Sequence, residues 1–205
     1  MTTLLWIRHG ETDWIGARLA GRMPGIHLNK TGMRQAEEIA RMLDPIPLDA
    51  FFSSPLERAM ETAQPSACAA GKPIVVMESL QEVDFGELAG LTFDELREVA
   101  LWKQVHYQPS TVKYPGGESL PEVQQRAVAA VGEIFTRYPH GVVALFTHSD
   151  TIRLVLCHFL KMPLDAYPGL VIDPASVSIL LQTERAQKIL GINLPPGSPL
   201  VVRPE

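Results

Sequence analysis

The sequence predicts an α/β protein, a three-layer α/β/α sandwich with a mainly parallel central sheet. Two observations predict this fold. Short apolar runs without charge recur along the chain, and helical patterns separate them, which is typical of parallel strands covered on both faces. No linker, repeat or low-complexity tract interrupts the 205 residues, which are enough to bury one substantial core. We therefore expect a single domain over residues 1–205.

Five apolar runs are predicted to be strands. The first, Leu4-Leu5-Trp6-Ile7, carries no charge and opens into a loop at Arg8. The predicted strands span residues 3–7, 49–52, 74–77, 142–146 and 177–181. Helical patterns between them leave room for crossover connections, so we expect most neighbouring strands to run parallel.

Helix signals fill the intervals between the strands. A helix is predicted to begin at Thr31 and to stop at Asp44-Pro45, because proline cannot continue a helix. Its apolar stripe consists of Met33, Ala36, Ile39, Ala40 and Leu43. This spacing places the stripe on one helical face, which is expected to cover the sheet. A further helical pattern follows the 142–146 strand and runs through Leu160.

Three capping boxes predict further helix N-termini. In this motif a serine or threonine is followed three residues later by glutamate. The pairs are Ser54 with Glu57, Thr92 with Glu95, and Ser119 with Glu122. The last two predict helices over about 93–107 and 120–138. In the first, Pro55 takes the first helical position, and Pro65 predicts a kink or an early end.

Two histidines follow predicted strands, at the edge where open α/β sheets usually bind ligands. His9 follows the first strand beside Arg8, and His148 follows the 142–146 strand. Arg58 is predicted in the first turn of a helix, where the guanidinium and the unpaired backbone N–H groups favour an anion. A lone histidine at such a turn equally fits a structural cap, so the prediction of an anion site depends on the whole set.

A carboxylate-rich loop over residues 80–86 follows the third predicted strand and provides proton donors for such a site. The candidate carboxyl groups are Glu78, Glu82, Asp84 and Glu87. Their spacing does not distinguish among them.

The chain resembles the histidine phosphatase superfamily, which includes cofactor-dependent phosphoglycerate mutases and many small phosphatases. The motifs, in the family's order, are RHGET at 8–12, SSPLERAMETA at 53–63, LQEVDFGELAG at 80–90, GGES at 116–119 and THS at 147–149. They cover nearly the whole chain. The resemblance implies a small phosphate monoester as substrate and an enzyme of the small-phosphatase branch that needs neither metal nor cofactor.

The resemblance also implies a role for each site residue. Neutral His9 attacks phosphorus and forms a phosphohistidine, while its other ring nitrogen donates to a backbone carbonyl. Glu82 protonates the leaving oxygen and then activates water. Arg8, Arg58 and a protonated His148 hold the phosphoryl oxygens. The expected substrate-binding residues are Thr12, Gly21, Arg22 and Ser149.

Three departures from the family's pattern bear on the substrate. Ile15 stands where many relatives carry asparagine, and Ala89 replaces an acidic or amide residue. Val83-Asp84 stand where phosphoglycerate mutases present cations for the substrate carboxylate, so Asp84 is expected to repel glycerate. We therefore expect a phosphomonoesterase. A phosphoglycerate mutase or other phosphomutase is the alternative, followed by a catalytically weak sensor of a phosphorylated ligand.

The insert over about 87–118 lies between two of the motifs and is predicted to be a helical lid over the substrate. Its rings belong to Trp102, His106, Tyr107 and Tyr114. The same rings fit simple packing between helices, and the sequence leaves both interpretations open.

Composition excludes several classes of partner. The net charge of −5 argues against nucleic acid and anionic membranes. Residues 8–34 nevertheless hold five basic against two acidic side chains, so positive charge gathers around the expected phosphate site. No apolar run approaches membrane-spanning length and the N-terminus enters a strand at once, so we expect a cytoplasmic protein.

The cysteine and histidine counts exclude other kinds of site. Cys68 and Cys157 are expected to be buried free thiols, because two cysteines are too few for a disulfide framework. The other histidines are His27, His106, His140 and His158. They lack the spacing of metal ligands, so no metal site is predicted. Whether the chain forms a homodimer is left open.

Overall fold

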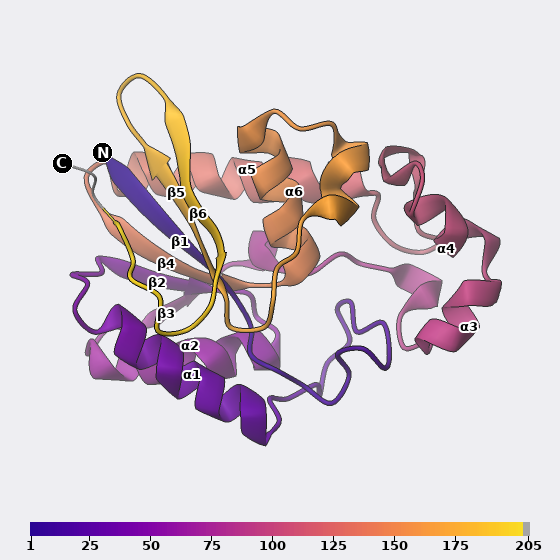
Figure 1. Cartoon of the computed structure of the whole chain (residues 1–205), viewed down its shortest axis with the longest axis horizontal. Coiled ribbons are helices and arrows are strands. Elements are labelled where there is room, and N and C mark those ends of the chain that lie inside the picture. The colour runs from indigo at the N-terminus through magenta and orange to yellow at the C-terminus, as the bar shows by residue number, and fades with distance from the viewer. Residues whose placement is uncertain (203–205) are drawn as a thin grey trace.

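The computed structural model describes residues 1–202 and shows a sheet with helices on both faces (Figure 1). The strands are β1 (Thr2–Arg8), β2 (Ala50–Ser53), β3 (Ile74–Val76), β4 (Val142–Thr147), β5 (Val177–Gln182) and β6 (Gln187–Leu194). Their order across the sheet is β3-β2-β4-β1-β5-β6. The first four in this order are parallel, with Arg8 opposite Thr147 and Ser53 opposite Phe146. The prediction of a mainly parallel sheet is confirmed.

The antiparallel side of the sheet was only partly predicted. Strand β5 matches the prediction over 177–181, but it runs antiparallel to β1. Strand β6 pairs with β5 at the edge and is missing from the sequence prediction. It begins with the polar pair Gln187-Lys188 and contains Gly191, and its pairing with β5 is irregular. Glycine and polar residues weaken a strand pattern, so the pairing itself defines this element.

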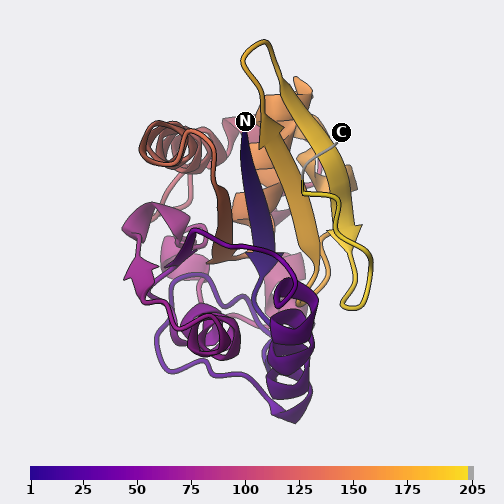
Figure 2. The same ribbon diagram turned by 90° about the vertical axis from the view of Figure 1, so that its left-hand side faces the viewer.

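The helices are α1 (Lys30–Leu43), α2 (Glu57–Ala69), α3 (Phe93–Glu98), α4 (Ala100–Val105), α5 (Leu120–Arg137) and α6 (Ser149–Leu160). Alternate side chains of β1 separate the two faces. Leu5 and Ile7 pack in one apolar cluster with α1 and α2, whereas Leu4 and Trp6 pack in another with α5 and α6. Figure 2 shows the sheet between these layers. The predicted three-layer sandwich is confirmed. No helix within residues 1–202 is long and apolar enough to cross a membrane.

Two of the capping boxes are confirmed, at Thr92 and at Ser119, and each cap bonds reciprocally with its glutamate. The single helix expected over 93–107 is instead two short helices, because the backbone is extended at Val99. Helix α2 continues past Pro65, so the early end expected there does not occur. Burial of the alanines on both sides of this proline favours continuation of the helix.

The capping box predicted at Ser54 is wrong. Helix α2 begins at Glu57, without a side-chain cap, so Pro55 lies before the helix and not at its first position. The Ser54 hydroxyl lies 2.8 Å from Nε2 of His148, and this tertiary partner competes with the expected cap. Arg58 does lie in the first turn, as predicted.

The thiols differ from each other. Cys157 is buried in α6, as expected, whereas Cys68 is exposed on α2, so the expectation of a buried thiol is wrong there. Its position near the C-terminal end of a surface helix, beside the Gln64 amide, explains the exposure.

Helices α3 and α4 project at the end of the molecule opposite the N-terminus (Figure 1). Their apolar side chains join a third cluster with the nearby ends of α5 and α6. This cluster includes Leu96, Val105, Tyr114, Val123, Leu154 and Cys157. The segment is therefore anchored on the helix layer rather than on the sheet.

Candidate active site

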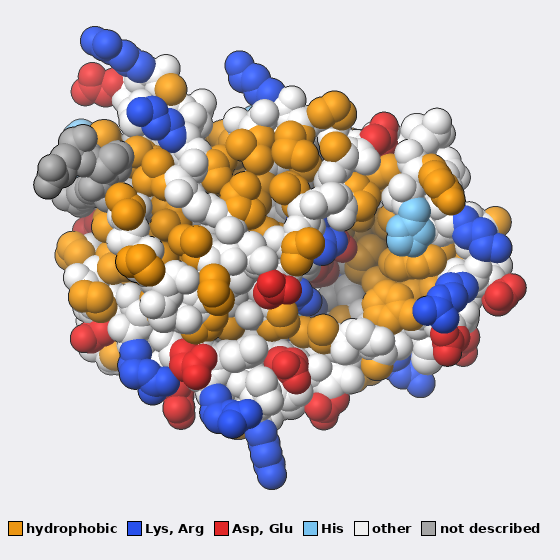
Figure 3. All heavy atoms as spheres, in the orientation of Figure 1, with side chains coloured by type: hydrophobic (Ala, Val, Ile, Leu, Met, Phe, Trp, Pro, Cys, Tyr) orange, Lys and Arg blue, Asp and Glu red, His pale blue; other side chains and the backbone are white. Residues whose placement is uncertain are grey.

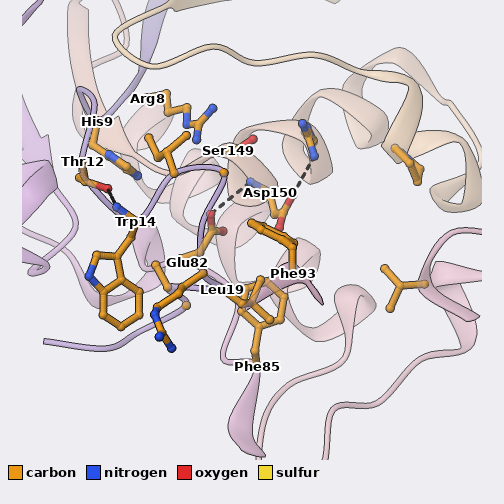
Figure 4. Close-up of a pocket in the computed structure, with 18 of the residues that line it drawn as sticks. Arg8, His9, Thr12, Trp14, Leu19, Glu82, Phe85, Phe93, Ser149 and Asp150 are labelled. Atoms are coloured by element: carbon orange, nitrogen blue, oxygen red, sulfur yellow. Dashed lines mark hydrogen bonds and ion pairs between the residues drawn. The ribbon is translucent and has the colours of Figure 1, made fainter. Parts of the chain in front are cut away.

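A cavity of about 390 Å³ lies beyond the carboxyl ends of the parallel strands. Figure 3 shows a hollow on this side of the molecule, bordered by hydrophobic side chains. In Figure 4, Arg8 and His9 lie at one end of the cavity, which we call the His9 end. Phe85 and Phe93 lie at the other, which we call the Phe93 end, and Glu82 lies between the two ends.

His9 directly follows β1 and is buried. Its Nδ1 lies 2.7 Å from the carbonyl oxygen of Gly10, which agrees with the expected backbone acceptor. When Nδ1 donates to this oxygen, Nε2 keeps its lone pair. Burial, together with the charges of Arg58 and Arg8, lowers the pKa of His9 well below 6.5. His9 is therefore a neutral imidazole with one nitrogen available as a nucleophile.

His148 directly precedes α6, and its ring centroid lies 5.2 Å from that of His9. A protonated His148 is expected from the sequence as a contact to a bound phosphoryl group, and this stays a prediction. Burial and the positive charge of Arg58 lower its pKa well below 6.5. A neutral His148 needs a bound anion before it takes up a proton.

Four buried nitrogen atoms around His9 have no hydrogen-bond partner within residues 1–202. They are Arg8 Nε, Arg58 Nε, Arg58 Nη1 and His148 Nδ1. The other contacts of the arginines fix the forks in place. Arg58 Nη2 donates to the Gly21 carbonyl at 2.7 Å, and Arg8 Nη1 donates to the Ile172 carbonyl at 2.6 Å. Burial lowers the pKa of Arg58 to about 10, which leaves it charged at neutral pH. Unpaired buried donors are costly, and an oxyanion would pair with them.

Among the four candidate carboxylates, Glu82 alone lines the described cavity. Oε1 accepts from the Val83 N–H at 3.0 Å, and Oε2 accepts from the Asp150 N–H at 3.3 Å. Burial raises the pKa of Glu82, and the negative charge of Asp150 raises it further. Glu82 thus keeps its proton to a higher pH than an exposed carboxyl group.

Asp84 does not point into the site. Its carboxylate accepts from the Gly86 N–H at 3.0 Å, and the residue is not part of the cavity wall in the described structure. The expectation that Asp84 repels a glycerate carboxylate is therefore wrong in its geometry. Besides Glu82, the carboxylate that lines the described cavity is that of Asp150.

The four predicted substrate-binding residues divide into two groups. Thr12, Gly21 and Ser149 line the cavity. Arg22 is not part of its wall within residues 1–202. Its Nη2 pairs with Glu118 at 2.7 Å, and its Nε donates to the Glu82 carbonyl at 3.0 Å.

Sequence reasoning missed several residues of the cavity wall. Arg153 pairs with Asp150 at 3.1 Å, and both side chains line the cavity. A signal was available, because Ser149 and Arg153 are four residues apart and share one face of α6. Trp14 and Phe93 also line the cavity, but they come from separate segments and no local pattern identifies them.

The aromatic residues of the 87–118 segment have different positions. Trp102 and His106 line the Phe93 end of the cavity, whereas Tyr107 is 81% exposed. Tyr114 is buried, and its ring meets Phe85 edge to face with centroids 4.9 Å apart. Packing therefore accounts for Tyr114, and the role of the segment as a lid stays a prediction.

Within residues 1–202, no three His, Cys, Asp or Glu side chains gather in a way that would hold a metal ion.

The chain is similar to several known proteins. The family model of the histidine phosphatase superfamily (branch 1) matches residues 4–195. Phosphoserine phosphatase 1 of Hydrogenobacter thermophilus is 29% identical over 95% of this chain and 93% of that protein. The 2,3-bisphosphoglycerate-dependent phosphoglycerate mutase of Thermoplasma acidophilum is 32% identical over 88% of this chain and 87% of its own length.

Solved structures show the same likeness. The structure of Bacillus stearothermophilus YhfR superposes with a TM-score of 0.89 at 28% identity, covering 95% of this chain and 98% of that one. The family match spans almost the whole chain and includes every residue placed at the His9 end. The chain belongs to the histidine phosphatase superfamily, branch 1.

Proposed function

We propose that this protein is a phosphomonoesterase that hydrolyses a small phosphorylated metabolite through a phosphohistidine at His9. One observation carries the proposal: unpaired buried nitrogen atoms of Arg8, Arg58 and His148 surround a neutral imidazole. A tetrahedral phosphoryl group presents oxygens to all of these groups at once. Phosphatases among the relatives support the same reaction class.

The first step is transfer of the phosphoryl group to the enzyme. Nε2 of His9 forms a bond to phosphorus while the bond from phosphorus to the ester oxygen breaks. Glu82 gives its proton to that oxygen, which leaves as an alcohol. Arg8 and Arg58 pair with the phosphoryl oxygens, and such cations stabilise the transition state by about 10³- to 10⁵-fold in rate.

The second step returns the enzyme to its starting state. Glu82, now ionised, takes a proton from a water molecule whose oxygen attacks phosphorus. The bond from phosphorus to His9 breaks, inorganic phosphate leaves, and both residues regain their first protonation states. Asp150 assists this cycle, because its negative charge raises the pKa of Glu82 and so favours the protonated form that the first step needs.

The leaving group occupies the Phe93 end of the cavity, where Phe93 and the neighbouring Trp102 contribute to the wall. We propose the 87–118 segment as the lid over this end. Arg153 is paired with Asp150. Its positive charge is therefore partly neutralised and attracts a substrate carboxylate only weakly. This arrangement favours water as phosphoryl acceptor over a bound phosphoglycerate.

Phosphoglycerate mutase activity is the second candidate. One observation favours it: the mutase of Thermoplasma acidophilum is among the relatives. A binding protein without turnover remains the third, although it needs neither a free nucleophile nor a protonated carboxyl group.

The test compares hydrolysis with phosphoryl migration. The protein is incubated with p-nitrophenyl phosphate, and separately with 3-phosphoglycerate and a bisphosphoglycerate primer. We expect phosphate release in both assays and little 2-phosphoglycerate. Chelator should leave both rates unchanged, since Arg8 and Arg58 provide the charge that a metal ion provides elsewhere. Isomerisation of phosphoglycerate much faster than hydrolysis would establish the mutase, and no turnover of any ester would leave the binding protein.

A further inference from the structure

Glu82 reaches the cavity from a loop, not from a strand end or a helix. The segment over 78–88 consists of two short 3-10 helices, Glu78–Leu80 and Gly86–Leu88, and the loop residues between them. Such a segment has few hydrogen bonds of its own, so other elements must hold the carboxyl group in place. The structure shows which residues do so.

Arg126 of α5 provides the largest part of this support. Its Nη1 donates to the carbonyls of Ser79 at 2.8 Å and Gln81 at 2.9 Å, and its Nη2 donates to the Glu82 carbonyl at 3.0 Å. Nε and Nη2 also donate to the two carboxylate oxygens of Glu118. These contacts use all five N–H groups of the guanidinium. One planar side chain thus binds three carbonyls of the loop that carries Glu82.

Glu118 and Arg22 complete the support from two other segments. Glu118 Oε2 accepts from the Asp84 N–H at 3.1 Å, just beyond Glu82. Burial opposes ionisation of Glu118, but its bonds with Arg126 outweigh this and lower its pKa overall. Arg22 pairs with the same carboxylate and donates to the Glu82 carbonyl. The Glu82 carbonyl therefore accepts from two guanidinium groups.

The opposite side of the loop is held by hydroxyl groups. Thr147 Oγ1 donates to the Leu80 carbonyl at 2.5 Å, and Thr151 Oγ1 donates to the Gln81 carbonyl at 2.8 Å. Every carbonyl from Ser79 to Glu82 thus accepts a bond from a distant side chain.

We propose that Arg126, Glu118 and Arg22, which we call the Glu82 clamp, position the proton donor of the reaction. Neither Arg126 nor Glu118 lines the described cavity, so both act through the loop rather than on the substrate. Their side chains are 18% and 20% exposed, which makes the guanidinium bonds hard for water to replace. Arg22 then has a positioning role in place of the substrate contact expected from the sequence. This inference rests on the proposed function of Glu82.

The test uses two substrates that differ in their need for the proton. An alkyl phosphate such as glycerol phosphate has a poor leaving group, whereas p-nitrophenolate leaves with little help. We expect Arg126→Ala to lower kcat for the alkyl ester by about tenfold or more and kcat for p-nitrophenyl phosphate by less than about threefold. Glu118→Gln and Arg22→Ala should show smaller effects in the same direction.

Two further variants separate positioning from general destabilisation. Arg126→Lys keeps the charge but has one ammonium group, so it should recover only part of the alkyl-ester rate. In the Glu82→Gln background, Arg126→Ala should lower the alkyl-ester rate by less than about twofold, because the group it positions is already gone. The control is Arg137→Ala, the same change near the other end of α5, where the side chain lies over the Phe52 and Tyr138 rings. It should leave the ratio of the two rates unchanged.

The outcomes are distinct. Equal losses with both substrates, or the same loss in the Glu82→Gln background as in the wild type, would show a merely structural role and overturn the clamp. If Arg126→Ala does not fold, Arg126→Lys and Arg22→Ala carry the same comparison. A wild-type protein that hydrolyses neither ester would instead refute the proposed function, independently of the clamp.

Discussion

The His9 end and the Phe93 end of the cavity are built in different ways. At the His9 end, buried side chains follow strands β1 and β4 or occupy the first turn of α2, so the backbone of the sheet fixes their positions. At the Phe93 end, the wall comes from the short helices α3 and α4 and from loops. Trp102 and His106 there are partly or fully exposed.

From this difference we expect the reacting groups at the His9 end and the groups that select the substrate at the Phe93 end. Groups fixed by a buried sheet tolerate little movement, because any shift leaves charges such as Arg58 unpaired in the interior. Substitutions in short surface helices destabilise the fold less. Variants at the His9 end should therefore change the rate, whereas variants at the Phe93 end should change substrate preference.

The largest effect is expected at the nucleophile. His9→Ala should keep the fold and lose at least ~10³-fold in rate, because binding alone does not replace a covalent intermediate. The measurement is steady-state turnover, together with acid quenching of wild-type enzyme and detection of acid-labile phosphate on His9. Label on His148, or full activity of His9→Ala without any label, would contradict the assignment.

The second effect is expected between the two ends, at the acid. Glu82→Gln should lower turnover of alkyl phosphates by about 10²-fold or more, since general acid catalysis typically contributes this much. Hydrolysis of p-nitrophenyl phosphate should fall far less. Comparable losses for the two esters would assign the proton to another group, and Asp150 is then the first candidate, because it also lines the cavity.

The pH profile tests the electrostatics of the same two residues. Activity requires His9 without its proton, and burial holds that pKa below 6.5, so protonation of His9 should lower the rate only at pH values below this. It also requires Glu82 with its proton, at a pKa above 4.5. Asp150→Asn removes the charge that raises the Glu82 pKa, so the alkaline limb should move to lower pH. An unmoved limb, measured as kcat/KM against pH, would show that another group controls it.

The smallest effect is expected at the Phe93 end. Trp102→Ala removes one aromatic wall of the cavity and should raise KM a few-fold with little change in kcat, because this contact is the same in ground and transition states. Tyr107→Ala is the matched control, since Tyr107 is in the same segment but 81% exposed. A large fall in kcat for Trp102→Ala would break the division between the two ends.

Several features of this protein follow from the local sequence alone. These features depend on neighbours within a few residues along the chain. They are the apolar runs that form strands, the capping boxes at Thr92 and Ser119, and the positions of His9, Arg58 and His148 next to strands or in a first helical turn. Short-range backbone geometry and hydrophobic periodicity suffice for such features. The α/β sandwich, and a site at the ends of the parallel strands, could therefore be predicted from the sequence.

Other features depend on contacts between residues far apart along the chain, so only the tertiary structure shows them. In the folded chain the Ser54 hydroxyl contacts His148 instead of capping a helix, and Arg22 pairs with Glu118. Folding also places Asp150, and not Asp84, in the cavity wall near Glu82, and burial lowers the pKa of His148. Hydrogen bonds and desolvation act between groups that folding brings together, at separations along the chain that no local pattern records, so only the folded chain sets the charge and contacts of each group.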